Sequence, residues 1–140
     1  MKKFLILLGF LATFLGAAEL QKEPGYAQAI SRALELNRPV VLVVSSHDCH
    51  YCDVFDSETL ADAMVIEALN RDFVTSVVYA SGSGYIPREL FTGATPTIWF
   101  LLPDGTPMYD PVMGAVGKED FIKALAIVHE EFGKTQHSGD

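Results

Sequence analysis

The chain has few cysteines, few basic residues and no hydrophobic run long enough to span a bilayer comfortably. Its longest apolar run covers residues 4–15, whereas a membrane helix needs about 20 residues. Ten Lys and Arg stand against 18 Asp and Glu, for a formal net charge of −8, which argues against partners such as nucleic acid or anionic membranes. Repeats and low-complexity linkers are also absent, so the 140 residues predict one domain with its own core.

The first 18 residues have the layout of a secretory signal peptide. Lys2 and Lys3 form a positive start, residues 4–15 an apolar centre, and the small residues 16–18 a cleavage site before Glu19. No cysteine follows the expected cut, so a lipid anchor is not expected, and an uncleaved membrane anchor is the alternative. Cleavage would leave a domain over residues 19–140, with a net charge of about −10 once both lysines are lost, in an oxidising compartment such as the periplasm.

The first half of the predicted domain alternates helix and strand. Apolar residues at helical spacing follow Pro24 and predict a helix that ends at Asn37. Residues 40–45, VVLVVS, form a β-branched run that is typical of a strand buried on both faces. Helical sequence follows the cysteines as far as Asn70, with a break near residues 57–59.

The second half predicts three more strands and a closing helix. Strands are expected over residues 73–79 and 97–102, with a short helix from Pro87 to Phe91 between them. The turn signal PDG, at residues 103–105, predicts an antiparallel fourth strand near residues 107–112, and its two prolines place it at a sheet edge. Apolar spacing in residues 121–132 predicts the last helix. We therefore expect an α/β fold in which a βαβ unit and a ββα unit form a mixed four-stranded sheet with helices on both faces.

The two cysteines, Cys49 and Cys52, fit a redox pair better than a structural disulfide. A disulfide stabilises a fold mainly by restricting the unfolded chain, and a bridge over three positions restricts very little. Both cysteines come at the start of a helix directly after a buried strand, where free N–H groups favour a thiolate. Because the thiolate is the attacking species, we expect Cys49 to be the exposed nucleophile and Cys52 the more buried resolving cysteine.

A metal site is the alternative use of these residues. His47, Cys49, His50 and Cys52 are all possible ligands of copper or zinc. Structural zinc usually takes a second ligand pair further along the chain, and this sequence has none. Covalent haem is excluded because Asp53, not histidine, follows the second cysteine.

A second signal is Thr95-Pro96, directly before the strand TIWFLL. Proline is acceptable at the first position of a central strand. A cis Thr95–Pro96 bond would cost little more than the trans form, and a trans proline that simply begins the strand is the alternative reading of the residues alone.

Together these features resemble the thioredoxin superfamily over most of the chain, from Tyr26 to Phe132. The resemblance is carried by CHYC after a hydrophobic strand, TP before TIWFLL, and the ending GAVGKEDFIKAL. It is closest to exported thioredoxin-like proteins, including the terminal domain of membrane electron transporters that reduce periplasmic clients. The resemblance implies that Pro96 is cis beside the cysteines, and that the backbone of Thr95 pairs with an extended client segment.

Two departures from the family pattern affect the expected chemistry. Asp48 stands where thioredoxins usually have tryptophan before the first cysteine, and Val43 stands where many have a buried aspartate that moves a proton. Deprotonation of Cys52 then needs another route, such as water or His50. Protonated His50 would stabilise the Cys49 thiolate and make the disulfide more oxidising, with a solvated surface histidine as the alternative.

The sequence therefore predicts a periplasmic thiol–disulfide oxidoreductase that reduces client disulfides through the Cys-His-Tyr-Cys pair. Tyr51, together with Thr95 before the proline, resembles periplasmic isomerases and related reductases. Those isomerases have a dimerisation domain before the thioredoxin fold, whereas only about seven residues would precede Tyr26 in the mature form. This favours a monomeric reductase over a dimeric isomerase. Disulfide-bonded clients and a membrane electron donor are the expected partners, and no organic cofactor or metal is required. The alternatives are an isomerase or oxidase on the same fold, a copper- or zinc-binding module, and an interaction module without turnover.

Overall fold

Four strands form one mixed sheet in the order β2-β1-β3-β4. The computed structural model describes residues 16–82 and 84–139, so the expected signal peptide lies largely outside the described residues. In the sheet, β1 (Val40–Ser45) pairs in parallel with β2 (Val74–Tyr79) and antiparallel with β3 (Thr97–Leu101). The short strand β4 (Val112–Met113) pairs antiparallel with β3 at the edge. The predicted α/β fold with a mixed four-stranded sheet is confirmed.

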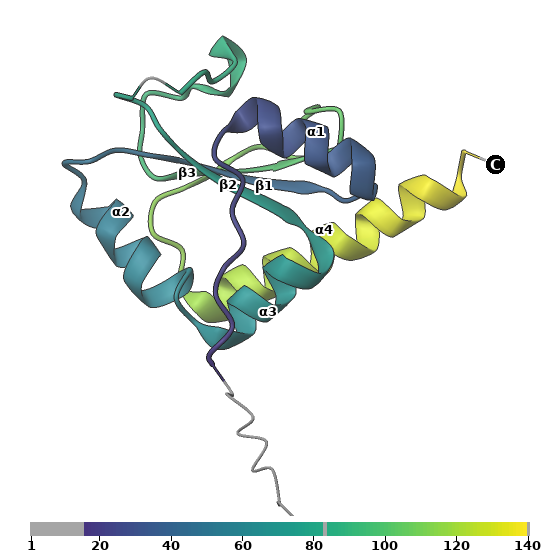
Figure 1. Cartoon of the computed structure of the whole chain (residues 1–140), viewed down its shortest axis with the longest axis horizontal. Helices are drawn as coiled ribbons and strands as arrows, with labels where there is room; N and C mark the ends of the chain where they lie inside the picture. Colours follow the sequence, from purple (N-terminus) through teal and green to yellow (C-terminus); the bar gives the residue numbers. More distant parts are fainter. Residues whose placement is uncertain (1–15, 83, 140) are drawn as a thin grey trace, which may run out of the picture.

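Helices cover both faces of this sheet, as Figure 1 shows. On one face lies α1 (Tyr26–Leu36), whose buried residues are Ala29 and Ala33. On the other face lie α3 (Ala63–Asp72) and the long α4 (Lys118–His137). The helix that carries the cysteines, α2 (His50–Val54), continues directly into a π-helical turn, η1 (Phe55–Thr59).

Strand β1 is buried at all six positions because its side chains alternate between two apolar clusters. Val41 and Val43 belong to the cluster on the side of α3 and α4, whereas Val40, Leu42 and Val44 belong to the cluster under α1. The first cluster also contains aromatic side chains from three other elements: Phe55, Phe100 and Phe121. The buried strand therefore fixes, from both sides, the point at which the chain emerges toward the cysteines.

Two elements are much shorter than the sequence predicts. The fourth strand is only Val112–Met113, and the earlier part of the predicted span contributes a single bridge between Pro107 and Leu101. Prolines at 107 and 111 explain this result, because a proline has no N–H to donate to a ladder. The predicted short helix is one 3-10 turn, Arg88–Leu90, with Pro87 directly before it.

The segment before α1 lies against the outer edge of β2. Glu23 N–H donates to Thr75 O (2.8 Å), and Ser76 Oγ donates to Glu23 O (3.0 Å). Further back, the side chain of Asn70 accepts from Gln21 N–H and donates to Glu19 O. We call residues 19–23 the N-terminal strap. In the described part of the chain, no helix is both long enough and apolar enough to cross a membrane.

Candidate redox site

The cysteine pair lies where β1 has ended and α2 begins. Cys49 is the N-cap residue of α2, and its Sγ accepts a hydrogen bond from the backbone N–H of Cys52 at 3.2 Å. The two cysteines form a disulfide, with their Cα atoms 5.2 Å apart. A sulfur thus occupies the capping position that a hydroxyl or carboxylate oxygen more often fills.

The two sulfurs differ in accessibility. Cys52 points into the fold and is 2% exposed, whereas Cys49 is half-buried at the rim. An incoming disulfide can therefore reach Cys49 from solvent, while Cys52 is reachable mainly through Cys49. This order of burial is the one that attack by Cys49 and resolution by Cys52 require.

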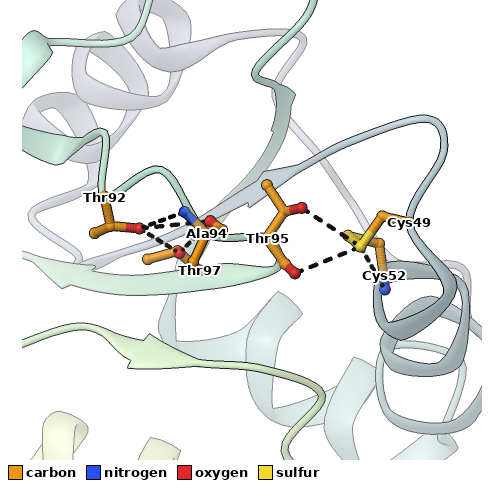
Figure 2. The surroundings of a disulfide bond; sticks show 6 residues. All are labelled: Cys49, Cys52, Thr92, Ala94, Thr95 and Thr97. Carbon is orange, nitrogen blue, oxygen red and sulfur yellow. Dashed lines mark hydrogen bonds between the residues drawn. A yellow bond between two sulfur atoms is a disulfide. The ribbon is translucent and has the colours of Figure 1, made fainter.

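Thr95 lies directly opposite Cys49, as Figure 2 shows. The Thr95 hydroxyl donates to Cys49 Sγ at 3.4 Å, and the Thr95 carbonyl oxygen lies 3.4 Å from the same sulfur. In the disulfide this sulfur carries no proton, so the carbonyl can accept a hydrogen bond only after reduction to the thiol. The hydroxyl and the Cys52 N–H, in contrast, stabilise a thiolate.

The Thr95–Pro96 peptide bond is cis. The carbonyl group of Pro96 is held by the residue that follows the edge strand β4, because Gly114 N–H donates to Pro96 O at 2.9 Å. Pro96 itself is buried, and β3 begins at the next residue. The structure thus brings together Cys49, Cys52, Thr95 and Pro96, which the sequence separates by more than forty positions.

A chain of hydroxyl groups that sequence reasoning missed braces the loop before Thr95. Thr97 Oγ1 donates to Ala94 O at 2.7 Å, so the 2.9 Å contact between the hydroxyls of Thr92 and Thr97 has Thr92 as its donor. Ala94 N–H donates back to Thr92 Oγ1 at 3.3 Å (Figure 2). The signal available in the sequence was three threonines within six residues around the Thr-Pro pair.

His50 and Tyr51 form the exposed first turn of α2. Tyr51 is 65% exposed, and its ring lies 5.6 Å from the His50 ring, centroid to centroid. His47 is occupied elsewhere, because its ring stacks on Tyr79 with centroids 4.2 Å apart. Within residues 16–82 and 84–139, no three His, Cys, Asp or Glu side chains are grouped in a way that would hold a metal ion.

The acidic residues that follow the cysteines are not equivalent. Acidic residues near the start of a helix, here Asp53, Asp56, Glu58 and Asp62, ordinarily favour the helix dipole and stay solvated. Asp56 is instead partly buried, and this burial raises the pKa of its carboxyl group, with a smaller contribution in the same direction from Asp53. The positive charge of Lys22, in the N-terminal strap, lowers the same pKa.

The fold is similar to that of several solved proteins. A thioredoxin from Thermus thermophilus matches with a TM-score of 0.71 and 24% identity, over 84% of this chain and 94% of that one. An oxidoreductase named DsbH matches with a TM-score of 0.66 and 16% identity, over 81% and 87% of the two chains. The oxidised C-terminal domain of DsbD from Neisseria meningitidis matches with a TM-score of 0.50 and 22% identity, over 69% and 86%.

Sequence relationships agree with the fold. An uncharacterized protein from Caenorhabditis elegans is 26% identical over 127 residues, which cover 82% of this chain but only 17% of that relative's length. The family model described as a thioredoxin-like domain matches residues 26–129, which confirms the superfamily predicted from the sequence. The chain therefore belongs to the thioredoxin-like domain family, and its fold and Cys49–Cys52 disulfide are those of a thiol–disulfide oxidoreductase.

Proposed function

We propose that the protein is a reductase of client protein disulfides, with Cys49 as the nucleophile and Cys52 as the resolving cysteine. The observation that carries the proposal is the asymmetry of the pair. Cys49 is half-buried at the rim and accepts two hydrogen bonds, from Cys52 N–H and Thr95 Oγ1, whereas Cys52 is 2% exposed. Donors directed at one sulfur stabilise its thiolate, which is the form that attacks a disulfide.

The reaction consists of two exchanges of sulfur bonds. The Cys49 thiolate attacks one client sulfur, a Cys49–client disulfide forms, and the other client sulfur leaves as a thiolate and takes a proton from solvent. Cys52 then attacks Cys49 Sγ, which re-forms the internal disulfide and releases the second client sulfur. Two electrons pass from the protein to the client. The backbone at Thr95, already beside Cys49, is positioned to pair with an extended client segment.

Acidic neighbours favour the reducing direction. Asp48 directly precedes Cys49, and Asp53 directly follows Cys52. Negative charge near a thiolate destabilises it, which favours the disulfide over the dithiol. A protein whose disulfide is favoured gives its electrons away.

The compartment and the partners belong to the proposal as well. We place the protein in the periplasm on the basis of the signal-peptide pattern in residues 1–18. In that oxidising compartment a reductase passes two electrons to each client and is left as the disulfide. A membrane thiol donor is therefore needed to restore the dithiol. We propose that the protein acts as a monomer on disulfide-bonded clients.

Insulin reduction tests the chemistry. With dithiothreitol as the electron source, the protein should accelerate insulin precipitation, and the Cys49→Ser variant should lose this activity completely. The Cys52→Ser variant should instead accumulate a client-linked form that is visible on a non-reducing gel. Unchanged insulin reduction by the Cys49→Ser variant would refute the proposal.

The equilibrium potential against glutathione tests the direction of electron flow. A reductase should have a potential close to that of thioredoxin, about −270 mV, whereas a strong oxidant lies near −120 mV. A value at the oxidising end would assign the protein to the oxidases or isomerases and leave the fold and the exchange chemistry intact.

A further inference from the structure

The resolving step has a proton to remove from a buried thiol. Cys52 is 2% exposed and is reached from solvent mainly through Cys49, so bulk water has little access to its S–H. Val43, on the adjoining strand, is fully buried in the apolar cluster and offers no proton acceptor. The exposed first turn carries His50, on the solvent side of α2. A basic group is therefore needed on the inner side of the helix.

Asp56 lies one helical turn after Cys52, on the same side of the helix. The intervening residues keep right-handed helical dihedrals: Val54 has φ −62° and ψ −47°, and Phe55 has φ −62° and ψ −43°. Side chains four residues apart in such a helix are neighbours, with Cβ atoms about 5–6 Å apart. This spacing makes Asp56, in the π-helical turn η1, a neighbour of Cys52 along the helix, so that a proton could pass between the two side chains directly or through one water molecule.

The surroundings of Asp56 suit a proton acceptor. Its partial burial disfavours the charged form, and two charged groups act on it from different elements: Asp53 on its own helix and Lys22 on the N-terminal strap. The strap is tied to the fold on both sides of Lys22, by Gln21 N–H to Asn70 Oδ1 (2.9 Å) and Glu23 N–H to Thr75 O (2.8 Å). The strap therefore holds the positive charge of Lys22 at a place where it lowers the pKa of the Asp56 carboxyl group and favours its charged form.

We propose that Asp56 accepts the proton of Cys52 in the resolving step and that Lys22 positions and tunes this carboxylate. The inference rests on the proposed function. In the Cys49–client mixed disulfide, the Cys52 proton passes to Asp56, and the Cys52 thiolate attacks Cys49 Sγ. The Cys49–Cys52 bond forms, the Cys49–client bond breaks, and the client sulfur leaves with the electron pair. Asp56 then returns the proton to the departing thiolate or to solvent.

The reagent dithiobis(nitrobenzoic acid) separates the two steps in one stopped-flow experiment. Its reaction with Cys49 of the reduced protein releases one coloured thiolate, and attack by Cys52 on the mixed disulfide releases the second. At a reagent concentration where the first step is fast, the Asp56→Asn variant should keep the first phase unchanged. Its second phase at pH 7 should be slower by about tenfold or more, since general-base catalysis contributes about 10²–10⁴-fold.

The pH profile distinguishes proton transfer from a packing defect. The Asp56→Asn defect should shrink above about pH 9, where hydroxide deprotonates a thiol without assistance. Asp56→Glu should restore part of the second-phase rate. In the Lys22→Met variant, the fall of the second-phase rate at acidic pH should begin at a higher pH than in the wild-type protein, because loss of the cation raises the pKa of Asp56. The matched control, Glu58→Gln, replaces an exposed carboxylate in the same π-helical turn as Asp56 and should leave both phases unchanged at pH 8.

Three outcomes would overturn the inference: a second phase of Asp56→Asn equal to that of the wild-type protein, an equal slowing of both phases, or a defect that stays constant with pH. None of them affects the proposed function, which fails instead if the wild-type protein shows no first phase.

Discussion

At the scale of single residues, the site is governed by what surrounds one sulfur. Cys49 Sγ lies within 3.4 Å of a backbone N–H, a hydroxyl and a carbonyl oxygen. The first two favour a thiolate, and the carbonyl favours a thiol. The reactivity of Cys49 is therefore the balance of a few contacts, two of which come from Thr95.

Replacing Thr95 by valine should make Cys49 less reactive. The substitution keeps the shape of the side chain and removes the hydroxyl that donates to Sγ. A hydrogen bond of about 1 kcal/mol corresponds to a roughly fivefold lower rate of alkylation by iodoacetamide at pH 7. Thr135→Val, which removes a hydroxyl bonded to Phe132 O in α4, is the control and should react at the wild-type rate. An unchanged rate for Thr95→Val would show that the backbone N–H alone sets the reactivity.

At the scale of elements, the helical region after the cysteines is a succession of three pieces: α2, the π-turn η1, and α3. The sequence predicted a break near residues 57–59, and the structure has a wider turn there, with Leu60 N–H bonded to Phe55 O. Helix α3 then begins at Ala63, and the side chain of its N-cap residue, Asp62, accepts from Met64 N–H (2.9 Å) and Val65 N–H (3.3 Å). Lys118 of α4 lies 3.3 Å from the same carboxylate, so this cap joins two helices.

Asp62→Ala should destabilise the fold in a pH-dependent way. The hydrogen bond from Val65 N–H, followed by Lys118 and Met64, lowers the pKa of Asp62. The stabilising effect of the carboxylate is therefore complete above its unfolded-state pKa, about 4, and is lost as the pH falls through the lower folded-state value. At pH 7 the variant should melt about 3–6 °C below the wild-type protein, and the difference should shrink as the pH falls below about 4.

Asp120→Ala provides the comparison for this cap. Asp120 is also in the first turn of a helix, but its side chain contacts only the exposed Lys123. Exposed pairs of this kind contribute little, so its melting temperature should stay close to that of the wild-type protein. If both variants lost the same stability, general loss of negative charge would explain the result better than capping.

At the scale of the whole molecule, the sequence predicted the fold well because its signals were periodic and long. The β-branched run of β1 and the apolar spacing of α4 each encode burial directly, and both elements lie where they were expected. Some features that depend on contacts between distant residues could not be predicted. The edge contact of the strap and the partial burial of Asp56 arise only when separate segments meet.

The aromatic contacts of Phe121 in the core should contribute strongly to the stability of the fold. Phe121 of α4 contacts Phe55, in the helix that follows the cysteines, and Phe100 of β3, with ring centroids 5.4 Å and 6.4 Å away. Phe121→Ala should lower the free energy of unfolding by about 3–5 kcal/mol, as measured by urea denaturation of the oxidised protein. Ile127→Ala on the same helix removes a side chain that is 58% exposed, and should change the stability by less than about 0.5 kcal/mol.

The strap along β2 has a practical consequence for anyone who shortens the protein. A fragment cut to the family match, residues 26–129, would lose Glu23 and leave the Thr75 carbonyl group and the Ser76 hydroxyl group without their partner. An uncovered edge strand readily pairs with strands of other molecules. Such a fragment should therefore associate in a concentration-dependent way, and the longer chain should not. The residues just before the family match thus cover the edge of β2 and keep the sheet of one molecule from pairing with the sheet of another.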